Sequence, residues 1–574
     1  MLRGLLYQPR VFASALDLGD IVAVQNRSGC APACHDSTCG SDGCGGSCGS
    51  CTGAKVCSNM NGPGTPKVCE MPTTGITAGG FYDGNGKYKV RFSPPYEGKW
   101  TYTTRSNVPA LDGKTGAFES TAPSAGSHGP VSSQGYSLVH ADGTPYFSVG
   151  STCYQWSSKD FSMQAETLQT LKIGQGHGPI FNKLRMTVFP KWYEYNSANP
   201  VQTGTAYEII PGSVAANATV WECDGGDCPP TAGSFDLSRF NVSYWQNYER
   251  LLRSMESLGV VADIIVFHPY DQGHWGFDCM GGRDPAHYDT AHDEFYLKYL
   301  AARVSSFSNV WWSMANEWNF CKCKSGGAVG DNGPTPVWDA LFKTLSSADP
   351  YGRQMSIHNG AFLYNHSQPW ITHVSLQGHE SDTPMLRAEY GKPTIWDEVE
   401  YEGDIPSSWG ALSGEEESDR FWWGASLGVH VGHSETILRP DVRVADQPLW
   451  WAKGGTLVGT SPPRIKWFRE LFEDNVTDFG SLLPTQESFG NSQSGYVANM
   501  LSNPGKFHFV HFLRPGTWTI PLKKCSGSAS CSWKVELLNY WEMTKTTLAA
   551  LPASAINATV DVPAIPFNVM LSVV

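Results

Sequence analysis

The strongest constraint on the fold is a long stretch in which short apolar runs alternate with helical patterns. Between residues 129 and 480, eight runs of strand length occur, and amphipathic segments such as NYERLLRSMESLG separate several of them. Alternating strand and helix segments indicate a parallel sheet whose strands are joined by helical crossovers. Eight such units over about 350 residues predict a (β/α)8 barrel, or TIM barrel, with long loops.

The eight predicted strands share an apolar body, and several end in polar or aromatic residues. In chain order they are YFSVGSTCYQW, ending near Trp156, FNKLRMTVFPKW, ending near Lys191, ADIIVFHPYD, NVWWSMANEW, RQMSIHN, ITHVSLQ, KPTIWDE and GVHVGHSET. Apolar residues at helical spacing predict helices in DEFYLKYLAARVSSF, EEESDRFWWGASLG and PPRIKWFRELFED.

The remaining chain has other patterns, which predict a multidomain protein. The expected parts are a leader at 1–29 without assigned structure, a Cys-rich module at 30–70, a linker at 71–77, a partial β-sandwich at 78–125, the barrel at 129–480 and a C-terminal β-sandwich at 487–574. Period-two alternation in both β segments supports these assignments. The N-terminal segment is short for a complete sandwich, so a missing strand would have to come from elsewhere.

Cysteine usage points to an oxidising compartment. The Cys-rich module holds Cys30, Cys34, Cys39, Cys44, Cys48, Cys51, Cys57 and Cys69, separated by Gly and Ser with almost no apolar residues to form a core. Such a segment needs cross-links, and we favour disulfides over zinc because its CxxC has no spaced partner motif. Cys525 and Cys531 are expected to bridge a hairpin end, and Cys223 and Cys228 a loop. Among Cys279, Cys321 and Cys323 one pair is expected, leaving a thiol for Cys153.

Composition narrows the function classes. The net charge is 41 − 54 = −13, which argues against nucleic acid as a partner because phosphate binding needs a basic face. No run is long and apolar enough for a membrane span, and the N-terminus is a poor signal peptide. The cysteines nevertheless indicate a secreted, extracellular protein, and six sequons (Asn26, Asn217, Asn241, Asn365, Asn475, Asn557) permit N-glycosylation. We expect the Cys-rich module to tether the protein to a surface or glycan.

Two predicted strands end in glutamates that suggest catalysis. Asn316 and Glu317 follow one apolar run, and Glu398 follows another. Parallel barrels place their chemistry at the C-terminal ends of strands. Two carboxyl groups facing each other across a pocket are what glycosidic bond cleavage needs. The plain alternative is that each Glu is a solvated loop charge, but the flanking tryptophans are too apolar for an ordinary surface loop.

These motifs resemble the retaining glycoside hydrolases of clan A. In that clan an Asn-Glu pair ends strand four and a second Glu ends strand seven, where the strand count places Asn316, Glu317 and Glu398. An Arg on strand two and a His after strand three are matched by Arg185 and His268.

The chain is more similar still to an uncharacterised family of candidate glycoside hydrolases that joins a β-sandwich, a TIM barrel and a C-terminal β-domain. The similar stretches are KVRFSPPYEGKWTYTTRSN, DGTPYFSVGSTCYQW, FHPYD, ANEWNF, WDEVEYEGDIPSSWG, VGHSET and LWWAKGG. The resemblance covers residues 78–574 and leaves out the Cys-rich module.

The resemblance implies Glu317 as general acid/base and Glu398 as nucleophile. Arg185 would keep Glu398 ionised, Asn316 would bond a sugar hydroxyl, and Trp318 would form part of a dry wall. Further expected substrate contacts are His268, His379, His433, Trp156 and Trp451. No cofactor is expected, and the substrate would be a polysaccharide or oligosaccharide.

Several alternatives remain open at this point. Strand parity predicts that Asp397 points away from Glu398, whereas Glu400 shares its parity and is the chief rival, with Glu402 further into the loop. A metal-dependent hydrolase would need a cluster such as His287, His292 and Asp293, whose spacing matches no known ligand template. The remaining alternative is a non-catalytic carbohydrate- or matrix-binding protein.

Overall fold

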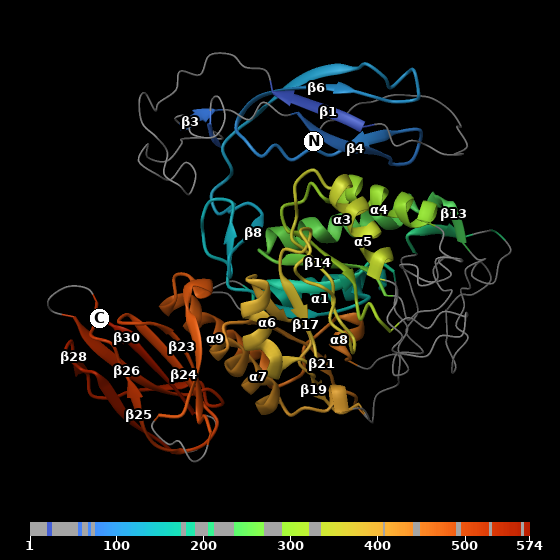
Figure 1. Ribbon diagram of the computed structural model, residues 1–574. Coiled ribbons are helices and arrows are strands. Elements are labelled where there is room, and N and C mark those ends of the chain that lie inside the picture. The colour runs from blue at the N-terminus through green and yellow to red at the C-terminus, as the bar shows by residue number, and fades with distance from the viewer. Residues whose placement is uncertain are drawn as a thin grey trace. The chain divides into compact units, whose positions relative to one another are not determined.

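The structure is a computed structural model (Figure 1). The chain divides into two compact units. The structure describes residues 20–25, 56–59, 67–70, 75–173, 179–189, 205–209, 211, 235–268, 290–320, 335–405, 408–439, 448–489, 495–526, 531–563 and 567–574. Lys191, His287 and the cysteines at 30–51, 223, 228, 279, 321 and 323 lie outside the described residues. Among the helices that are described, none has the length and apolarity needed to span a membrane.

The first unit contains Met1–Ser127, Ala291–Phe307 and Lys343–Gly352. Its sheet is antiparallel and has the strand order β5 (Tyr88–Val90), β4 (Ile76–Tyr82), β1 (Asp20–Gln25), β6 (Gly98–Thr104), β7 (Thr115–Ser120). β1 comes from the segment expected to be a leader without structure, and it lies between β4 and β6. The strand that 78–125 lacked is therefore supplied by the leader.

Part of the Cys-rich module forms a hairpin. β2 (Val56–Asn59) and β3 (Lys67–Glu70) pair antiparallel, and the register places Cys57 opposite Cys69. All of α4 (Thr290–Val304) except its first residue belongs to the first unit, where the Arg303 guanidinium donates to the buried carboxylate of Asp83 at 2.8 Å.

The second unit contains the predicted barrel, and all eight predicted strands are confirmed. They follow the chain around the parallel sheet as β10 (Val149–Thr152), β11 (Lys183–Thr187), β14 (Val261–Phe267), β15 (Val310–Ala315), β16 (Met355–Ser356), β17 (Val374–Leu376), β18 (Thr394–Trp396) and β20 (His430–His433). A parallel bridge between His358 and Ser375 links β16 to β17 and brings the two ends of the sheet together. The residues of these strands are buried, as expected for a barrel whose interior is filled by side chains.

The four helical segments predicted from the sequence are confirmed as α3 (Val242–Ser257), α4, α7 (Gly414–Ser426) and α9 (Ser461–Asn475). The structure also contains α1 (Phe161–Lys172), α5 (Thr335–Ala348), α6 (Thr383–Tyr390) and α8 (Trp450–Lys453), which were not predicted. Ser413 caps α7 in a reciprocal arrangement with Glu416, which satisfies backbone N–H groups at the helix start. Short strand pairs occur outside the barrel: β8 (Val131–Gln134) with β9 (Ser137–His140), β12 (Tyr207–Ile209) with β13 (Phe235–Phe240), and β19 (Glu402–Gly403) with β21 (Glu435–Thr436).

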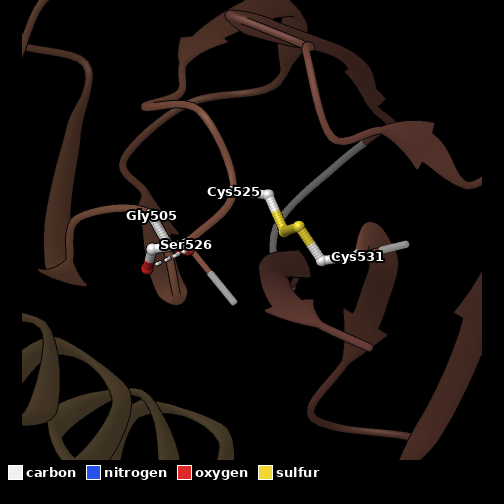
Figure 2. Close-up of a disulfide and its surroundings, with 4 residues drawn as sticks. All are labelled: Gly505, Cys525, Ser526 and Cys531. Carbon is white, nitrogen blue, oxygen red and sulfur yellow. Dashed lines mark hydrogen bonds between the residues drawn. A yellow bond between two sulfur atoms is a disulfide. The ribbon is translucent and has the colours of Figure 1, made fainter. Parts of the chain in front are cut away.

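The C-terminal residues form the predicted all-β domain. Its larger sheet contains β22 (Leu483–Glu487), β23 (Ala498–Asn503), β24 (Phe507–Phe512), β30 (Phe567–Val573), β26 (Ser532–Asn539), β27 (Thr544–Thr547) and β28 (Leu551–Pro552). β25 (Gly516–Pro521) pairs with β29 (Asn557–Val562), and Ile520 and Val560 share an apolar core with Val510 and Val569 of the larger sheet. The predicted disulfide Cys525–Cys531 is confirmed (Figure 2).

The C-terminal sheet packs directly on barrel helices. Trp422 of α7 contacts Phe509 of β24 and Tyr540, with ring centroids 5.7 and 5.6 Å apart. Phe472 of α9 contacts the same Phe509 at 5.3 Å. One continuous apolar cluster therefore joins the barrel helices to the C-terminal sheet.

Candidate active site

Five polar side chains converge where barrel strands end. Arg185 lies on β11, Asn316 follows β15 directly, and Tyr154, His358 and Glu398 each stand two residues past the end of β10, β16 and β18. Because parallel strands all end on the same side of the barrel, residues far apart in the sequence meet there.

Glu398 is held by two donors. The Arg185 guanidinium donates from Nη1 to Oε1 of Glu398 at 2.8 Å, and the Tyr154 hydroxyl donates to the same oxygen at 2.5 Å. The Oε2 oxygen receives neither bond. Glu398 is 3% exposed, so these bonds are shielded from water. The expectation that Arg185 contacts Glu398 matches this geometry.

The surroundings of Glu398 favour its charged form. Burial acts to raise the pKa of its carboxyl group, but the charge that His358 carries in acid, the charge of Arg185 and the bonds from Tyr154 and Arg185 lower the pKa to about 2. Burial, and then the Arg185 charge, lower the pKa of His358 to about 4, so His358 is neutral near pH 7. Arg185 and Tyr154 therefore stabilise the carboxylate at neutral pH.

Asn316 connects this arrangement to Glu317. The Arg185 Nη2 donates to Oδ1 of Asn316 at 2.6 Å, and Nδ2 of Asn316 donates to Oε2 of Glu317 at 3.3 Å. Nε2 of Gln377 donates to Oε1 of Glu317 at 2.9 Å. The Arg185 guanidinium thus bonds Glu398, which follows β18, and Asn316, which follows β15. Glu317, unlike Glu398, is only partly buried.

Glu317 has a strained backbone. Its φ is 50°, in the left-handed region that costs a non-glycine residue on the order of 1 kcal/mol. The neighbouring residues hold it there, because the Asn316 N–H donates to Phe267 and the Trp318 N–H donates to His358, at 3.0 and 3.1 Å. Strain of this kind often occurs where a side chain must be aimed for function.

The prediction for Asp397 is wrong. Asp397 does not point away from the site: it accepts a bond from Lys183 inside the barrel, and Nε of Arg185 is 4.0 Å from its Oδ1. The cause is the length of β18, which ends at Trp396, so strand alternation does not continue through residues 397 and 398. Both carboxylates therefore lie near Arg185.

The rival glutamates have other partners. Glu400 is partly exposed and pairs with Arg420 of α7 at 3.4 Å. Glu402 is buried and accepts bonds from the N–H groups of Thr460 and Ser461, at 2.7 and 2.9 Å, at the start of α9. Glu398 is the glutamate of this loop that contacts Arg185 and Tyr154.

Two predicted tryptophan contacts pack against tyrosine rings. Trp451 packs against the rings of Tyr154 and Tyr401 at 5.9 and 6.3 Å, beside Glu398. Trp318 is buried directly after Glu317, and its ring lies 6.1 Å from that of Tyr364.

The predicted histidines are spread along the strand ends. His268 is buried just past β14 and donates to the Phe189 carbonyl at 3.1 Å. His379 is part-exposed after β17 and contacts Asp382 at 3.1 Å.

Of the two remaining predicted contacts, His433 is not brought to the carboxyl pair. His433 stacks on Phe181 at 4.7 Å and has Nε2 at 3.8 Å from Glu417 of α7, so it faces the helix layer outside the barrel. Trp156 is fully buried at the start of a short 3-10 helix (Trp156–Ser158).

The residues considered for a disulfide or a metal have other surroundings. Cys153 is a free, buried thiol rather than a disulfide partner, and burial raises its pKa well above the usual range. His292 and Asp293 lie on α4. Across the described ranges, no group of three or more His, Cys, Asp and Glu side chains is arranged to hold a metal ion.

Sequence reasoning missed several residues of the site. Tyr154, His358, Gln377 and Lys183 stand within or just after apolar strands, and the sequence analysis did not single them out. A usable signal was the Lys183-x-Arg185 spacing: two cations on the same face of a buried strand require anionic partners inside the barrel.

A second group of carboxyl groups is buried near β19 and β21. Glu417 accepts from the N–H groups of Glu402 and Ser434, and Glu435 accepts from those of Val458 and Gly459, at 2.7 and 2.8 Å. A Cβ at residue 459 would lie 2.5 Å from a carboxylate oxygen of both Glu402 and Glu435, so only glycine fits. Burial, partly offset by these bonds, raises the pKa of Glu435 to about 7.

We expect Glu435 to make the protein less stable as the pH rises. A carboxyl group whose pKa is higher in the folded state binds its proton more tightly there, so its contribution is full below the usual value of 4.5 and is lost as the pH passes 7. The shift corresponds to about 3 kcal/mol. Thermal melts from pH 5 to 8 should show a falling Tm, and Glu435→Gln should flatten the profile. The surface variant Glu470→Gln should keep the wild-type slope; a Glu435→Gln profile parallel to wild type would contradict the assignment.

Comparisons with known proteins identify the family and agree with the barrel fold. Residues 132–434 match the family described as "Apiosidase-like, catalytic domain", and residues 69–107 match a domain of unknown function, DUF5060. A crystal structure from Bacteroides vulgatus ATCC 8482, described as a putative glycoside hydrolase, is 29% identical with a TM-score of 0.69 and covers 87% of this chain and 93% of its own. A glycoside hydrolase family 5 structure from the same organism shares the fold at 16% identity, with a TM-score of 0.54 and coverage of 78% and 94%. No curated protein matches the chain.

Proposed function

The chain belongs to the family of apiosidase-like catalytic domains and is a glycoside hydrolase with the clan A fold, and we propose that it works by a retaining double displacement. Glu398 is the nucleophile and Glu317 the general acid/base. The observation that carries this assignment is the bond pattern of Arg185, which links Glu398 directly, and Glu317 through Asn316, at the strand ends. Membership of a catalytic-domain family favours an enzyme over the alternative of a non-catalytic carbohydrate- or matrix-binding protein.

The reaction follows from these roles. In the first step a carboxylate oxygen of Glu398 attacks the anomeric carbon while Glu317 gives its proton to the leaving oxygen, so a glycosyl ester forms and the glycosidic bond breaks. In the second step Glu317 takes a proton from water, which attacks the anomeric carbon and releases Glu398. Retention requires carboxyl groups about 5–5.5 Å apart. The low pKa of Glu398 suits a group that must stay ionised, and its buried bonds to Arg185 and Tyr154 keep it oriented.

The substrate we propose is a polysaccharide or glycoconjugate outside the cell. The family description makes glycosides of the branched pentose apiose the first to test, because loops set specificity in barrels of this kind. The Cys525–Cys531 disulfide supports an oxidising, extracellular location, and the hairpin with Cys57 opposite Cys69 is consistent with a cross-linked module that tethers the protein.

The full chain tests the proposal directly. We expect it to release sugar from an apioside or another member of a panel of nitrophenyl glycosides and plant polysaccharides. Proton NMR of the first anomer formed should show the configuration of the substrate. Appearance of the opposite anomer first would replace the double displacement by an inverting mechanism. Folded protein that releases nothing from the whole panel would contradict glycan hydrolysis.

A further inference from the structure

Lys183 is a buried lysine in the barrel interior that the catalytic roles above do not use. We propose that Lys183 is a positioning residue: by pairing with Asp397 it reserves Arg185 for Glu398 and Asn316, and through Ser375 it keeps the His358 proton on Nδ1, away from Glu398. This inference rests on the proposed role of Glu398 as nucleophile. It assigns a function in the reaction to the buried polar side chains around Glu398.

Lys183 lies between two carboxylates. Its Nζ donates to Oδ2 of Asp263 at 2.9 Å and to Oδ1 of Asp397. The Lys183 side chain is 0% exposed and each carboxylate is 2% exposed. A buried ion pair broken by removal of one partner leaves an uncompensated charge, which the protein relieves by moving the nearest opposite charge.

The nearest other cation to Asp397 is Arg185. Its Nε is 4.0 Å from Oδ1 of Asp397 and makes no hydrogen bond within the described part of the chain. Its two other nitrogens bond Glu398 and Asn316. Arg185 and Lys183 together balance three carboxylates, those of Asp263, Asp397 and Glu398. Without Lys183, the Arg185 guanidinium would be the cation left near all three carboxylates. Asp397 would then compete with Glu398 for the hydrogen bonds of Arg185.

The same pair of residues fixes the tautomer of His358. The Ser375 hydroxyl donates to Oδ2 of Asp397 at 2.5 Å, because an ionised carboxylate can only accept. Ser375 has no second proton, so its oxygen must accept from Nδ1 of His358 at 2.9 Å. The neutral ring then has no proton on Nε2, which lies 3.5 Å from Oε1 of Glu398.

This arrangement keeps His358 from donating to Glu398, which receives bonds from Arg185 and Tyr154. If the bonds through Ser375 are broken, His358 can place its proton on Nε2 and become an additional donor to the nucleophile. The charged or titratable groups facing Glu398 are Arg185 from β11, Tyr154 after β10, His358 after β16, Tyr401 after β18 and the adjacent Asp397; Glu317 after β15 is connected through Asn316. Burial raises the pKa of both tyrosines well above the usual range, so they stay protonated near neutral pH.

The test compares Lys183→Met with the double variant Lys183→Met/Asp397→Asn. The single change should lower kcat/KM by about 10- to 100-fold, as loss of an orienting residue commonly does. It should also move the acidic limb of the pH profile up by about one unit, because Glu398 loses part of Arg185. The double variant removes the competing carboxylate and should recover most of both effects. Lys392→Met is the matched control, because Lys392 donates to the His366 and Gln368 carbonyls; its rate should stay within about twofold.

A second readout does not depend on activity. Nitrogen-15 NMR of histidine-labelled protein, with His358→Gln to assign the signal, should show the Nδ1–H tautomer at pH 7 in the wild type. The Nε2–H form should appear in Lys183→Met, because there Asp397 turns from Ser375 towards Arg185 and Ser375 loses its acceptor. It should also appear in Ser375→Ala, which serves if Lys183→Met does not fold. An unchanged tautomer in Ser375→Ala, or a double variant as slow as the single one, would overturn the proposal. A wild type that hydrolyses nothing would refute the proposed function, while the NMR result would still decide the state of His358.

Discussion

Glu398→Gln should reduce kcat/KM by about 10⁴- to 10⁶-fold, the scale expected when a nucleophile is removed. The amide keeps the shape of the side chain and can still accept from Arg185 and Tyr154, but it cannot form the glycosyl ester. Initial rates on the best substrate from the panel, together with a thermal melt to establish folding, would measure the effect.

Two neighbouring glutamates provide matched controls for this change. Glu400→Gln removes a partly exposed carboxylate paired with Arg420 and should leave the rate within about threefold. Glu402→Gln changes a group that accepts hydrogen bonds from the start of α9. It should lower Tm clearly and leave kcat close to the wild-type value. If Glu400→Gln were as inactive as Glu398→Gln is expected to be, the nucleophile would be misassigned.

Glu317→Ala should have a large effect that depends on the leaving group. Without the acid, a poor leaving group such as a sugar hydroxyl should be released about 10²- to 10⁴-fold more slowly, the contribution typical of general acid–base catalysis. Dinitrophenolate needs no proton to leave, so formation of the glycosyl ester from a dinitrophenyl glycoside should be nearly unaffected. A burst of phenolate followed by slow turnover would show both effects in one experiment.

Azide supplies a further check on Glu317. A small anion can enter the space left by the side chain and attack the ester without help from a general base. The Glu317→Ala variant should therefore turn over faster in azide and yield a glycosyl azide that keeps the anomeric configuration of the substrate. Equal losses for sugar and dinitrophenyl leaving groups, with no response to azide, would refute the acid/base role.

The barrel was predictable because its signal is repeated. Eight buried strands, most of them separated by helical stretches, give a repeated pattern that remains recognisable when one loop is irregular. The order of strands around a parallel barrel follows the chain. The same order predicted that Asn316, Glu317 and Glu398 would lie on one side. Their mutual contacts through Arg185 follow from that placement.

The parts that were missed depend on register and length, which local patterns do not encode. Asp397 was misplaced because β18 stops one residue before it. β1 was not expected because its partners, β4 and β6, lie more than fifty residues further along the chain. His433 is a polar residue at a strand end, as a site residue would be, but its side chain faces α7. Lys183 and His358 were overlooked because a single polar residue in or next to an apolar strand does not indicate a function. Its role becomes visible only when its hydrogen-bond partners from other strands are known.

The shared apolar cluster between α7, α9 and the C-terminal sheet affects how the chain can evolve or be divided. The change of pattern near residue 487 marks a boundary in sequence, but Trp422, Phe472 and Phe509 bury one another across it. Recombination at that boundary would separate two halves of a single hydrophobic core, exposing aromatic surface on each half. We therefore expect the C-terminal β-domain to be inherited together with the barrel, as part of its scaffold.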